Sequence, residues 1–159
     1  MRCVTVSGDL LDQPVEAIVN AWNRNVIPCW LLLPQGVSGA LKRRAGLEPF
    51  WELARMGPIP LGEAVVTSAG RLPFKAIIHV AGINLLWRSS EFSVRQSVRS
   101  ALRLAHEHRF ASLALPLIGA GSGGGSESQV EAWMRDELGR IPFEGEVRLV
   151  RFSKTASRA

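Results

Sequence analysis

Segments with the pattern of buried strands alternate with segments of helical periodicity along the chain, and this alternation limits the possible folds most. Apolar runs rich in β-branched residues and leucine predict strands at Cys3–Val6, Ala17–Asn20, Ala64–Thr67, Ala76–Val80, Ser112–Leu117 and Val147–Phe152. Helical spacing of apolar residues predicts helices at Val37–Ala45, Pro49–Arg55, Ser93–His108 and Ser128–Leu138. Several of the strand runs are continuous rather than alternating, which is typical of strands covered on both faces. We therefore predict an α/β fold, a three-layer α/β/α sandwich around a mixed, mostly parallel six-stranded sheet.

The composition favours one globular domain over residues 1–153, followed by a basic, frayed tail at 154–159. The chain has 159 residues, of which 47% are hydrophobic and 21% charged, so it can bury a core of ordinary size. No apolar run approaches the ~18–20 residues of a membrane span, and the first residues have a strand pattern rather than a leader pattern. Cys3 and Cys29 have no short Cys/His spacing around them, which argues against a disulfide framework or a zinc site. We expect a cytoplasmic monomer without metal or cofactor.

The net charge of +5 is spread along the chain and does not by itself identify an anionic partner. Arg95, Arg99 and Arg103 recur at helical spacing, and we interpret them as a solvated helix face rather than a nucleic-acid surface. Trp51 and Trp133 fall in predicted helices, and we interpret both as core residues. We therefore do not expect nucleic acid or membrane as a partner.

Polar residues follow the first two predicted strands, where ligands of such sheets bind. Asp9, within Gly8-Asp9-Leu10, can accept a hydrogen bond from a ligand amine or cap a local turn. Asn20 and Asn23, within Asn20-Ala21-Trp22-Asn23, offer a donor and an acceptor each. These two amides suit sugar hydroxyls, or alternatively brace the loop.

Two glycine-bearing turns each precede a predicted helix. They are Gln35-Gly36-Val37-Ser38-Gly39 and Ile118-Gly119-Ala120-Gly121-Ser122-Gly123-Gly124-Gly125. Glycine lets the backbone approach a ligand, and helix N-termini favour phosphate, so the two turns together could bind a diphosphate. Flexible loops are the alternative. Ser126-Glu127-Ser128-Gln129 fits a capping box behind the second turn. A dinucleotide fingerprint fits poorly, because it would open a βαβ unit and here only one strand follows.

Taken in order, these motifs resemble the macrodomain family of ADP-ribose-binding modules over roughly residues 4–150. The residues that carry the resemblance are Gly8-Asp9-Leu10, Ala17-Ile18-Val19-Asn20-Ala21-Trp22-Asn23, Gly36-Val37-Ser38-Gly39-Ala40 with Lys42-Arg43-Arg44-Ala45-Gly46, Leu61-Gly62-Glu63-Ala64-Val65-Val66-Thr67-Ser68, Ala76-Ile77-Ile78-His79-Val80-Ala81-Gly82 and Leu115-Pro116-Leu117-Ile118-Gly119-Ala120-Gly121-Ser122-Gly123-Gly124. The resemblance implies that Asp9 and the Leu10 amide bind adenine, that Asn23 holds the distal ribose, and that the two turns hold the diphosphate. It also implies an aromatic side chain stacked on adenine, for which Phe152 is the first candidate and Phe143 the second. The expected ligand-binding set is Asp9, Leu10, Asn20, Asn23, Gln35, Gly36, Val37, Ser38, Gly39, Ile118, Gly119, Ala120, Gly121, Ser122, Gly123 and Phe152.

The chain departs from the pattern of the family's hydrolases at two places. Ser38 occupies the position where these hydrolases usually carry an aspartate that orients or activates water. Ser122-Gly123 occupies a position that is commonly aromatic, and Trp30, in an extended loop, is our candidate to fill that space; packing under the loop is the alternative.

The resemblance implies binding of ADP-ribose and hydrolysis of ADP-ribose from protein carboxylates or from related ADP-ribosyl esters. Asn23 and Ser38 are the expected catalytic residues, because together they could hold the attacking water. The alternative is a module that reads ADP-ribose without catalysis, since a serine is not a base near neutral pH. The expected partners are ADP-ribose and ADP-ribosylated proteins.

Overall fold

The computed structural model describes residues 1–26, 36–121 and 124–153. The helices and strands in these ranges are β1 (Arg2–Gly8), a 3-10 turn η1 (Leu10–Asp12), β2 (Ala17–Trp22), α1 (Gly36–Ala45), α2 (Glu48–Arg55), β3 (Ala64–Thr67), β4 (Ala76–Ala81), α3 (Glu91–Glu107), β5 (Ser112–Pro116), α4 (Glu127–Leu138) and β6 (Glu146–Phe152). Every predicted strand and helix is present, while η1 was not expected. The predicted tail at 154–159 lies outside the described residues.

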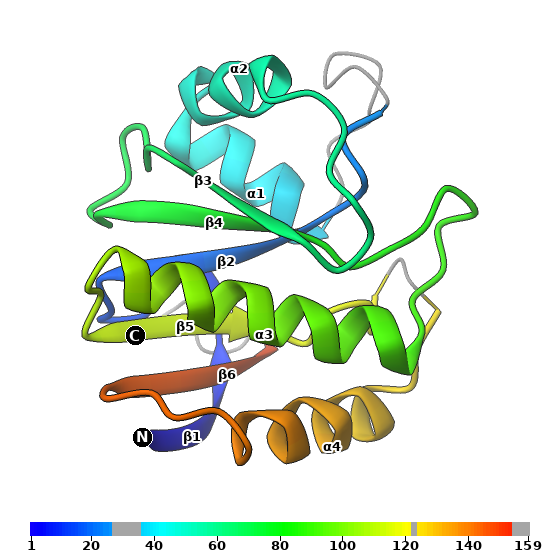
Figure 1. Cartoon of the computed structure of the whole chain (residues 1–159). Coiled ribbons are helices and arrows are strands. Elements are labelled where there is room, and N and C mark those ends of the chain that lie inside the picture. The colour runs from blue at the N-terminus through cyan, green and yellow to red at the C-terminus, as the bar shows by residue number, and fades with distance from the viewer. Residues whose placement is uncertain (27–35, 122–123, 154–159) are drawn as a thin grey trace.

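The six described strands form one mixed sheet in the order β1-β6-β5-β2-β4-β3. All neighbours pair in parallel except β3, which runs antiparallel to β4 at the edge. The predicted mixed, mostly parallel sheet is therefore confirmed. Because five strands are parallel, their carboxyl ends meet at one edge of the sheet, on the right of Figure 1.

Helices cover both faces of the sheet, which explains the continuous apolar runs in the sequence (Figure 1). In β2, Ala17 and Val19 pack on the side of α3 and α4, while Ile18 packs on the side of α1, α2 and η1. All three side chains are fully buried. The sheet therefore lies between two apolar layers, and a polar residue within one of its strands is an exception.

One of the two tryptophans interpreted as core residues lies on the surface. Trp51 is 57% exposed on α2, because the helical period turns Phe50 and Leu53 toward the core and Trp51 outward. Trp133 is partly buried against the core, as expected.

The arginines of α3 are not simply solvated. Arg95 and Arg99 bind Glu137 of α4, and Arg103 binds Glu63 and Glu107. Burial alone would raise the pKa of Glu137, but hydrogen bonds and charge from Arg99 and Arg95 outweigh it and lower the pKa. This face of α3 is thus an ion-paired contact between helices rather than a free basic surface.

Candidate functional site

The predicted site residues gather at the carboxyl edge of the sheet. Asp9 follows β1, Phe152 ends β6, the second glycine turn follows β5, and Asn23 follows β2. The strand order therefore sets the order of these groups along the edge. Of the expected residues, Trp30, Gln35, Ser122 and Gly123 lie outside the described residues.

Asp9 caps the turn η1, as the simpler of the two sequence readings predicted. Its Oδ1 accepts a hydrogen bond from the Leu11 amide at 2.8 Å, and its Oδ2 lies 3.8 Å from Nη1 of Arg44. Nη2 of Arg44 also donates to Asp12 at 2.8 Å. Oδ2 of Asp9 can still accept a hydrogen bond from a ligand, because the carboxylate is only half-buried and a carboxylate oxygen has two acceptor sites. The sequence analysis gave Arg44 no role in the site, although α1 brings it to Asp12 from 32 residues away.

Phe152 lies beside Asp9 through the register of the sheet. Its Cα pairs with that of Gly8 across β1 and β6, and its side chain is 67% exposed. An exposed ring at this place can stack on a planar ligand. Phe143, the second candidate, is buried in the core before the start of β6, so that alternative is wrong.

The first glycine turn opens α1. Gly36 has a φ of +55°, and no described residue lies within 4 Å of the position that a Cβ would take there. The first amides of an α-helix have no acceptor within the helix, and the helix dipole adds partial positive charge at the same place. The amides of Gly36, Val37, Ser38 and Gly39 lie at this end of the helix, which is therefore suited to an anion, although Gly39 itself is buried.

The second glycine turn needs glycine for steric reasons at Gly119. Its φ is +80°, and a Cβ would lie 2.3 Å from Cβ of Ser89. The Gly125 amide donates to the Gly119 carbonyl at 3.1 Å, and the Ala120 amide donates to the Leu117 carbonyl at 3.2 Å. The first of these bonds ties the described residues on either side of positions 122–123 to one another. At Gly121, by contrast, no described residue lies within 4 Å of a Cβ position, so the backbone there is open to a ligand.

The helix behind this turn begins at Glu127, close to the predicted start. The predicted capping box is wrong, however, because the Ser126 side chain makes no capping hydrogen bond and its Oγ lies 3.0 Å from Oγ of Ser128. A capping box that was not expected closes the start of α3 instead, between Ser90 and Ser93.

Asn23 braces its own loop and keeps hydrogen-bonding capacity for a ligand. Its Oδ1 accepts the Asn25 amide at 2.7 Å, and the residue is 7% exposed. The Nδ2 amide provides the donors through which Asn23 can hold a sugar hydroxyl or a water.

A chain of buried hydrogen bonds leads from Ser38 into the sheet. Ser38 Oγ lies 2.9 Å from Asn20 Oδ1, and Asn20 Nδ2 lies 3.0 Å from His79 Nδ1. His79 Nε2 lies 2.8 Å from Thr67 Oγ1, which in turn lies 3.0 Å from the carbonyl oxygen of Ser68. The side chains of Asn20 and His79 are completely buried. Asn20 is therefore too deep to contact a ligand itself, which corrects its expected place in the binding set.

The donor and the acceptor of each hydrogen bond in this chain follow from the last bond, which ends on the Ser68 carbonyl. A carbonyl oxygen only accepts, so the Thr67 hydroxyl donates to Ser68 and must accept from Nε2–H of His79. Nδ1 of His79 then accepts from the Asn20 amide, and Asn20 Oδ1 accepts from the Ser38 hydroxyl. The Ser38 proton thus points inward, and its oxygen offers only lone pairs to the site.

The surroundings keep the chain neutral. Burial lowers the pKa of His79 to about 3, so the imidazole is uncharged near neutral pH. The Phe50 ring stands edge-on to His79 at 6.0 Å between ring centroids. The Ser68 amide donates to Glu52 of α2 at 3.0 Å, which fixes the far end. A neutral, fully paired chain of this kind is rigid.

Sequence reasoning did not find this chain, although a signal exists in retrospect. Asn20 and His79 are polar residues in otherwise apolar strands, and their Cα atoms are register partners across β2 and β4. Lys42 was also missed: its Nζ lies 5.7 Å from the Trp22 ring and 5.1 Å from the Phe50 ring, one helical turn after Ser38. The amine adds positive charge on the side of α1 that faces β2.

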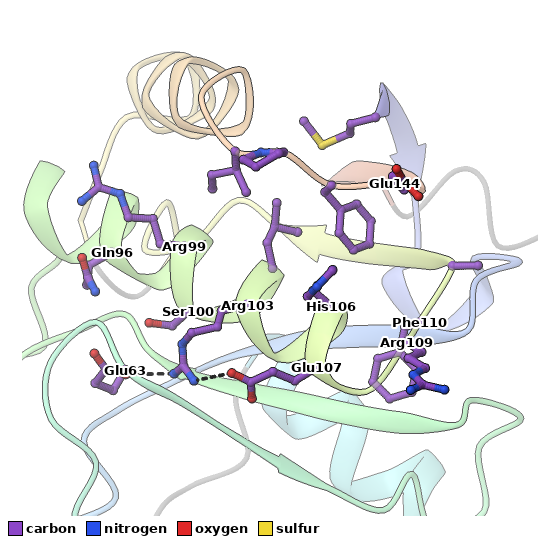
Figure 2. A pocket seen from close by; sticks show the side chains of 16 residues that line it. Glu63, Gln96, Arg99, Ser100, Arg103, His106, Glu107, Arg109, Phe110 and Glu144 are labelled. Carbon is purple, nitrogen blue, oxygen red and sulfur yellow. Dashed lines mark hydrogen bonds and ion pairs between the residues drawn. The ribbon is translucent and has the colours of Figure 1, made fainter.

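A cavity of about 1090 Å³ lies away from these groups, at the amino-terminal ends of the parallel strands. Figure 2 shows its lining, which comes from α3 and from the segments that precede β5 and β6. Arg103 spans this lining and binds Glu63 at 3.3 Å and Glu107 at 3.1 Å. Among the predicted site residues that the structure describes, only Phe143, the second candidate for stacking on adenine, lines this cavity.

Within residues 1–26, 36–121 and 124–153, no helix is long and apolar enough to span a bilayer. The same ranges contain no group of three or more His, Cys, Asp or Glu side chains placed to hold a metal ion.

The fold and the site define a class of α/β domain in which an acid, two amide-rich turns and a neutral polar chain meet at one sheet edge. A family model described as Macro domain matches residues 19–134, and the chain belongs to this family. The resemblance drawn from the motifs is therefore confirmed.

Related proteins carry informative names. An O-acetyl-ADP-ribose deacetylase of Citrobacter rodentium is 39% identical over 128 residues, which cover 76% of this chain and 68% of the relative. The Oceanobacillus iheyensis macrodomain solved with ADP has a TM-score of 0.82 at 26% identity, over 96% of this chain and 84% of that one. A variant of the same macrodomain, solved with ADPR, has the same score and identity.

Proposed function

We propose that this protein binds ADP-ribose at the carboxyl edge of its sheet and hydrolyses ADP-ribosyl esters, either of protein carboxylates or of small acids such as acetate. One observation carries the catalytic part of the proposal. The inward hydrogen bond of Ser38 leaves its oxygen as an acceptor at the N-terminus of α1, and its partner Asn20 lies in β2, three residues before Asn23.

The binding part follows the order of groups along the edge. Adenine lies against Asp9, the Leu10 amide and Phe152, and the diphosphate lies between the two glycine turns. The distal ribose then reaches Asn23 and Ser38. Two amide-rich turns suit a ligand with two phosphate charges, because helix ends and turn amides both favour anions. The names of the relatives and the ligands of the solved neighbours support this arrangement.

By accepting a hydrogen bond, Ser38 can take over one function of an aspartate at this position, the orientation of a water. An ionised carboxylate can only accept hydrogen bonds, and the Ser38 oxygen is restricted to accepting by its bond to Asn20. Ser38 can therefore orient a water by accepting one of its protons, while the Asn23 amide donates to the oxygen of that water. A neutral serine is not a base, so a phosphate oxygen of the ligand accepts the proton.

The reaction needs little further chemistry from the protein. The water oxygen attacks the anomeric carbon, the bond from that carbon to the ester oxygen breaks, and the electron pair leaves on the carboxylate. A carboxylate is a good leaving group, so positioning and electrostatic stabilisation supply most of the rate acceleration.

The direct test is release of ADP-ribose from a protein that is mono-ADP-ribosylated on glutamate. We expect the wild-type protein to release it and Asn23→Ala to be slower by about 100-fold, because the water and the ribose lose a positioning donor. Equal rates for the two proteins would contradict the assignment of Asn23.

A reader without catalysis is the second candidate, and the neutral hydroxyl at position 38 favours it. In that case the modified protein would bind, resist hydrolysis, and be displaced by free ADP-ribose. Failure to bind ADP-ribose at all would contradict both candidates.

A further inference from the structure

An apolar turn lies exposed between β4 and α3 and has no role in the site described above. The turn comprises residues 83–90, and we refer to it as the β4–α3 turn. The exposed fractions of three consecutive side chains are 58% for Leu85, 77% for Leu86 and 44% for Trp87. Solvent-facing apolar side chains in a row are characteristic of contact surfaces for other molecules.

The backbone holds this turn in one shape. Asn84 Oδ1 accepts the amides of Leu86 at 2.9 Å and Arg88 at 3.1 Å. The Trp87 amide donates to the Asn84 carbonyl at 3.0 Å, and the Asn84 amide donates to the Arg88 carbonyl at 2.9 Å. Trp87 has a φ of +59°, a conformation that a bulky residue adopts only when its surroundings enforce it. The apolar side chains are thus presented by a built structure.

The β4–α3 turn is joined to the second glycine turn. Ser89 Oγ donates to the Gly119 carbonyl at 3.2 Å. A Cβ on Gly82, just before the β4–α3 turn, would lie 2.5 Å from the Ile118 side chain. These contacts connect the loop after β4 to the loop after β5 across β2, and Figure 1 shows residues 83–90 projecting from the carboxyl edge.

The strand order sets where this turn lies relative to the proposed ligand. Adenine is assigned to the ends of β1 and β6, and the distal ribose to the end of β2 with Asn23 and Ser38. The next strand in the sheet is β4. Continuing along the edge from adenine through the distal ribose therefore leads to the β4–α3 turn, which is the direction in which the group esterified to the distal ribose extends.

We propose that the β4–α3 turn is a docking surface for the polypeptide that carries the ADP-ribose; this inference rests on the proposed function. The segment that it fits has an apolar side chain next to the modified carboxylate. Arg88, the one charged residue of the turn, makes no ion pair with an acid of the described residues, so it can pair with an acid of that segment. An acetyl group is too small to reach Leu85 and Leu86. The turn thus favours modified proteins over small esters as substrates.

The test compares two esters of ADP-ribose, one formed with a protein carboxylate and one formed with a small acid. The variant Leu85→Ser/Leu86→Ser removes exposed side chains, so it is expected to fold as the wild type does. The matched control is Leu47→Ser, which removes a side chain of similar exposure (52%) beside α2, on another part of the surface. We expect kcat/KM for a glutamate-ADP-ribosylated protein to fall about tenfold in the double variant, mainly through KM, because the lost apolar contacts lie outside the reacting bond.

The second substrate, O-acetyl-ADP-ribose, and the Kd for free ADP-ribose are expected to stay within about twofold of the wild type in both variants. An equal loss on both substrates, or no loss on the modified protein, would overturn the docking proposal. If neither substrate is hydrolysed, the same comparison is made on binding, and the double variant is expected to weaken binding of the modified protein but not of free ADP-ribose. If free ADP-ribose does not bind, the proposed function fails and this inference fails with it.

Discussion

The two ends of the carboxyl edge are built in different ways. At the β1 end, Asp9 and Arg44 form a charged, half-exposed pair that water reaches. At the β2 end, Ser38 is held by Asn20 and His79, which are neutral and completely buried. A solvated ion pair stabilises little and adapts to a ligand, whereas a buried neutral chain is costly to break and fixes geometry. Recognition therefore suits the first end, and positioning of a reacting water suits the second.

The largest expected effect breaks the buried chain. Asn20→Leu removes the acceptor of the Ser38 hydroxyl and the donor to Nδ1 of His79, so that buried ring nitrogen loses its partner. We expect turnover to fall about 100-fold, because Ser38 is free to rotate and no longer orients the water. The free energy of unfolding is expected to fall by about 3 kcal/mol in urea titrations. ADP-ribose affinity, measured by calorimetry, should change by less than about threefold, since Asn20 does not contact the ligand. A normal turnover in a destabilised Asn20→Leu would contradict the positioning role.

The protonation of His79 provides the next effect. Its pKa is lowered to about 3 in the folded protein, so between that value and 6.5 the unfolded chain binds a proton that the folded chain does not. Stability is therefore full above pH 6.5 and declines as the pH falls toward 3, by about 2 kcal/mol at pH 5. Urea titrations of the wild type and His79→Gln at pH 7 and pH 5 check this. The variant should lose the pH dependence, and an equal slope in both proteins would contradict it.

A substitution at the adenine end should change the affinity for ADP-ribose and leave turnover unchanged. Asp9→Ala is expected to weaken ADP-ribose binding about tenfold and to leave kcat unchanged, because it removes an acceptor that contacts the ligand far from the reacting bond. Asp12→Ala is the matched control: it removes the other acidic partner of Arg44 but leaves Asp9 in place. A similar loss in both variants would assign the effect to Arg44 instead.

The smallest effect concerns Phe152. Phe152→Ala is expected to raise the Kd for ADP-ribose about fivefold, as expected for one lost stacking contact. Because the ring is 67% exposed, the melting temperature should not change. Trp51→Ala, another exposed aromatic, should alter neither quantity, and a Kd unchanged in Phe152→Ala would remove this residue from the site.

The sequence was sufficient for the fold because strand and helix patterns are local. The strand pattern of an apolar run such as Ala76–Ala81 can be recognised from its own residues, and the glycine turns can be recognised from their composition. The motifs also predicted that Asp9, Asn23 and Phe152 follow or end strands, and the structure has all three at the carboxyl edge of the sheet. These features need no knowledge of which strands are neighbours.

What the sequence could not supply depends on neighbours in space. Asn20 meets His79 only because β2 and β4 pair in register across 59 residues. The direction of the chain depends on the Ser68 carbonyl, which no side-chain pattern reveals. Likewise, Ser126 has the residue types of a capping box but makes a different contact, because the local geometry decides between alternatives of similar energy.

The role of Ser38 in positioning the water is tested by single-turnover release of ADP-ribose by Ser38→Ala from a glutamate-ADP-ribosylated protein. The variant removes only the oxygen that the buried chain orients. We predict that the rate of release falls about 100-fold below that of the wild type while the affinity for ADP-ribose stays nearly unchanged. A wild-type rate in Ser38→Ala would show that the chain behind it does not position the reacting water, and would contradict the central claim.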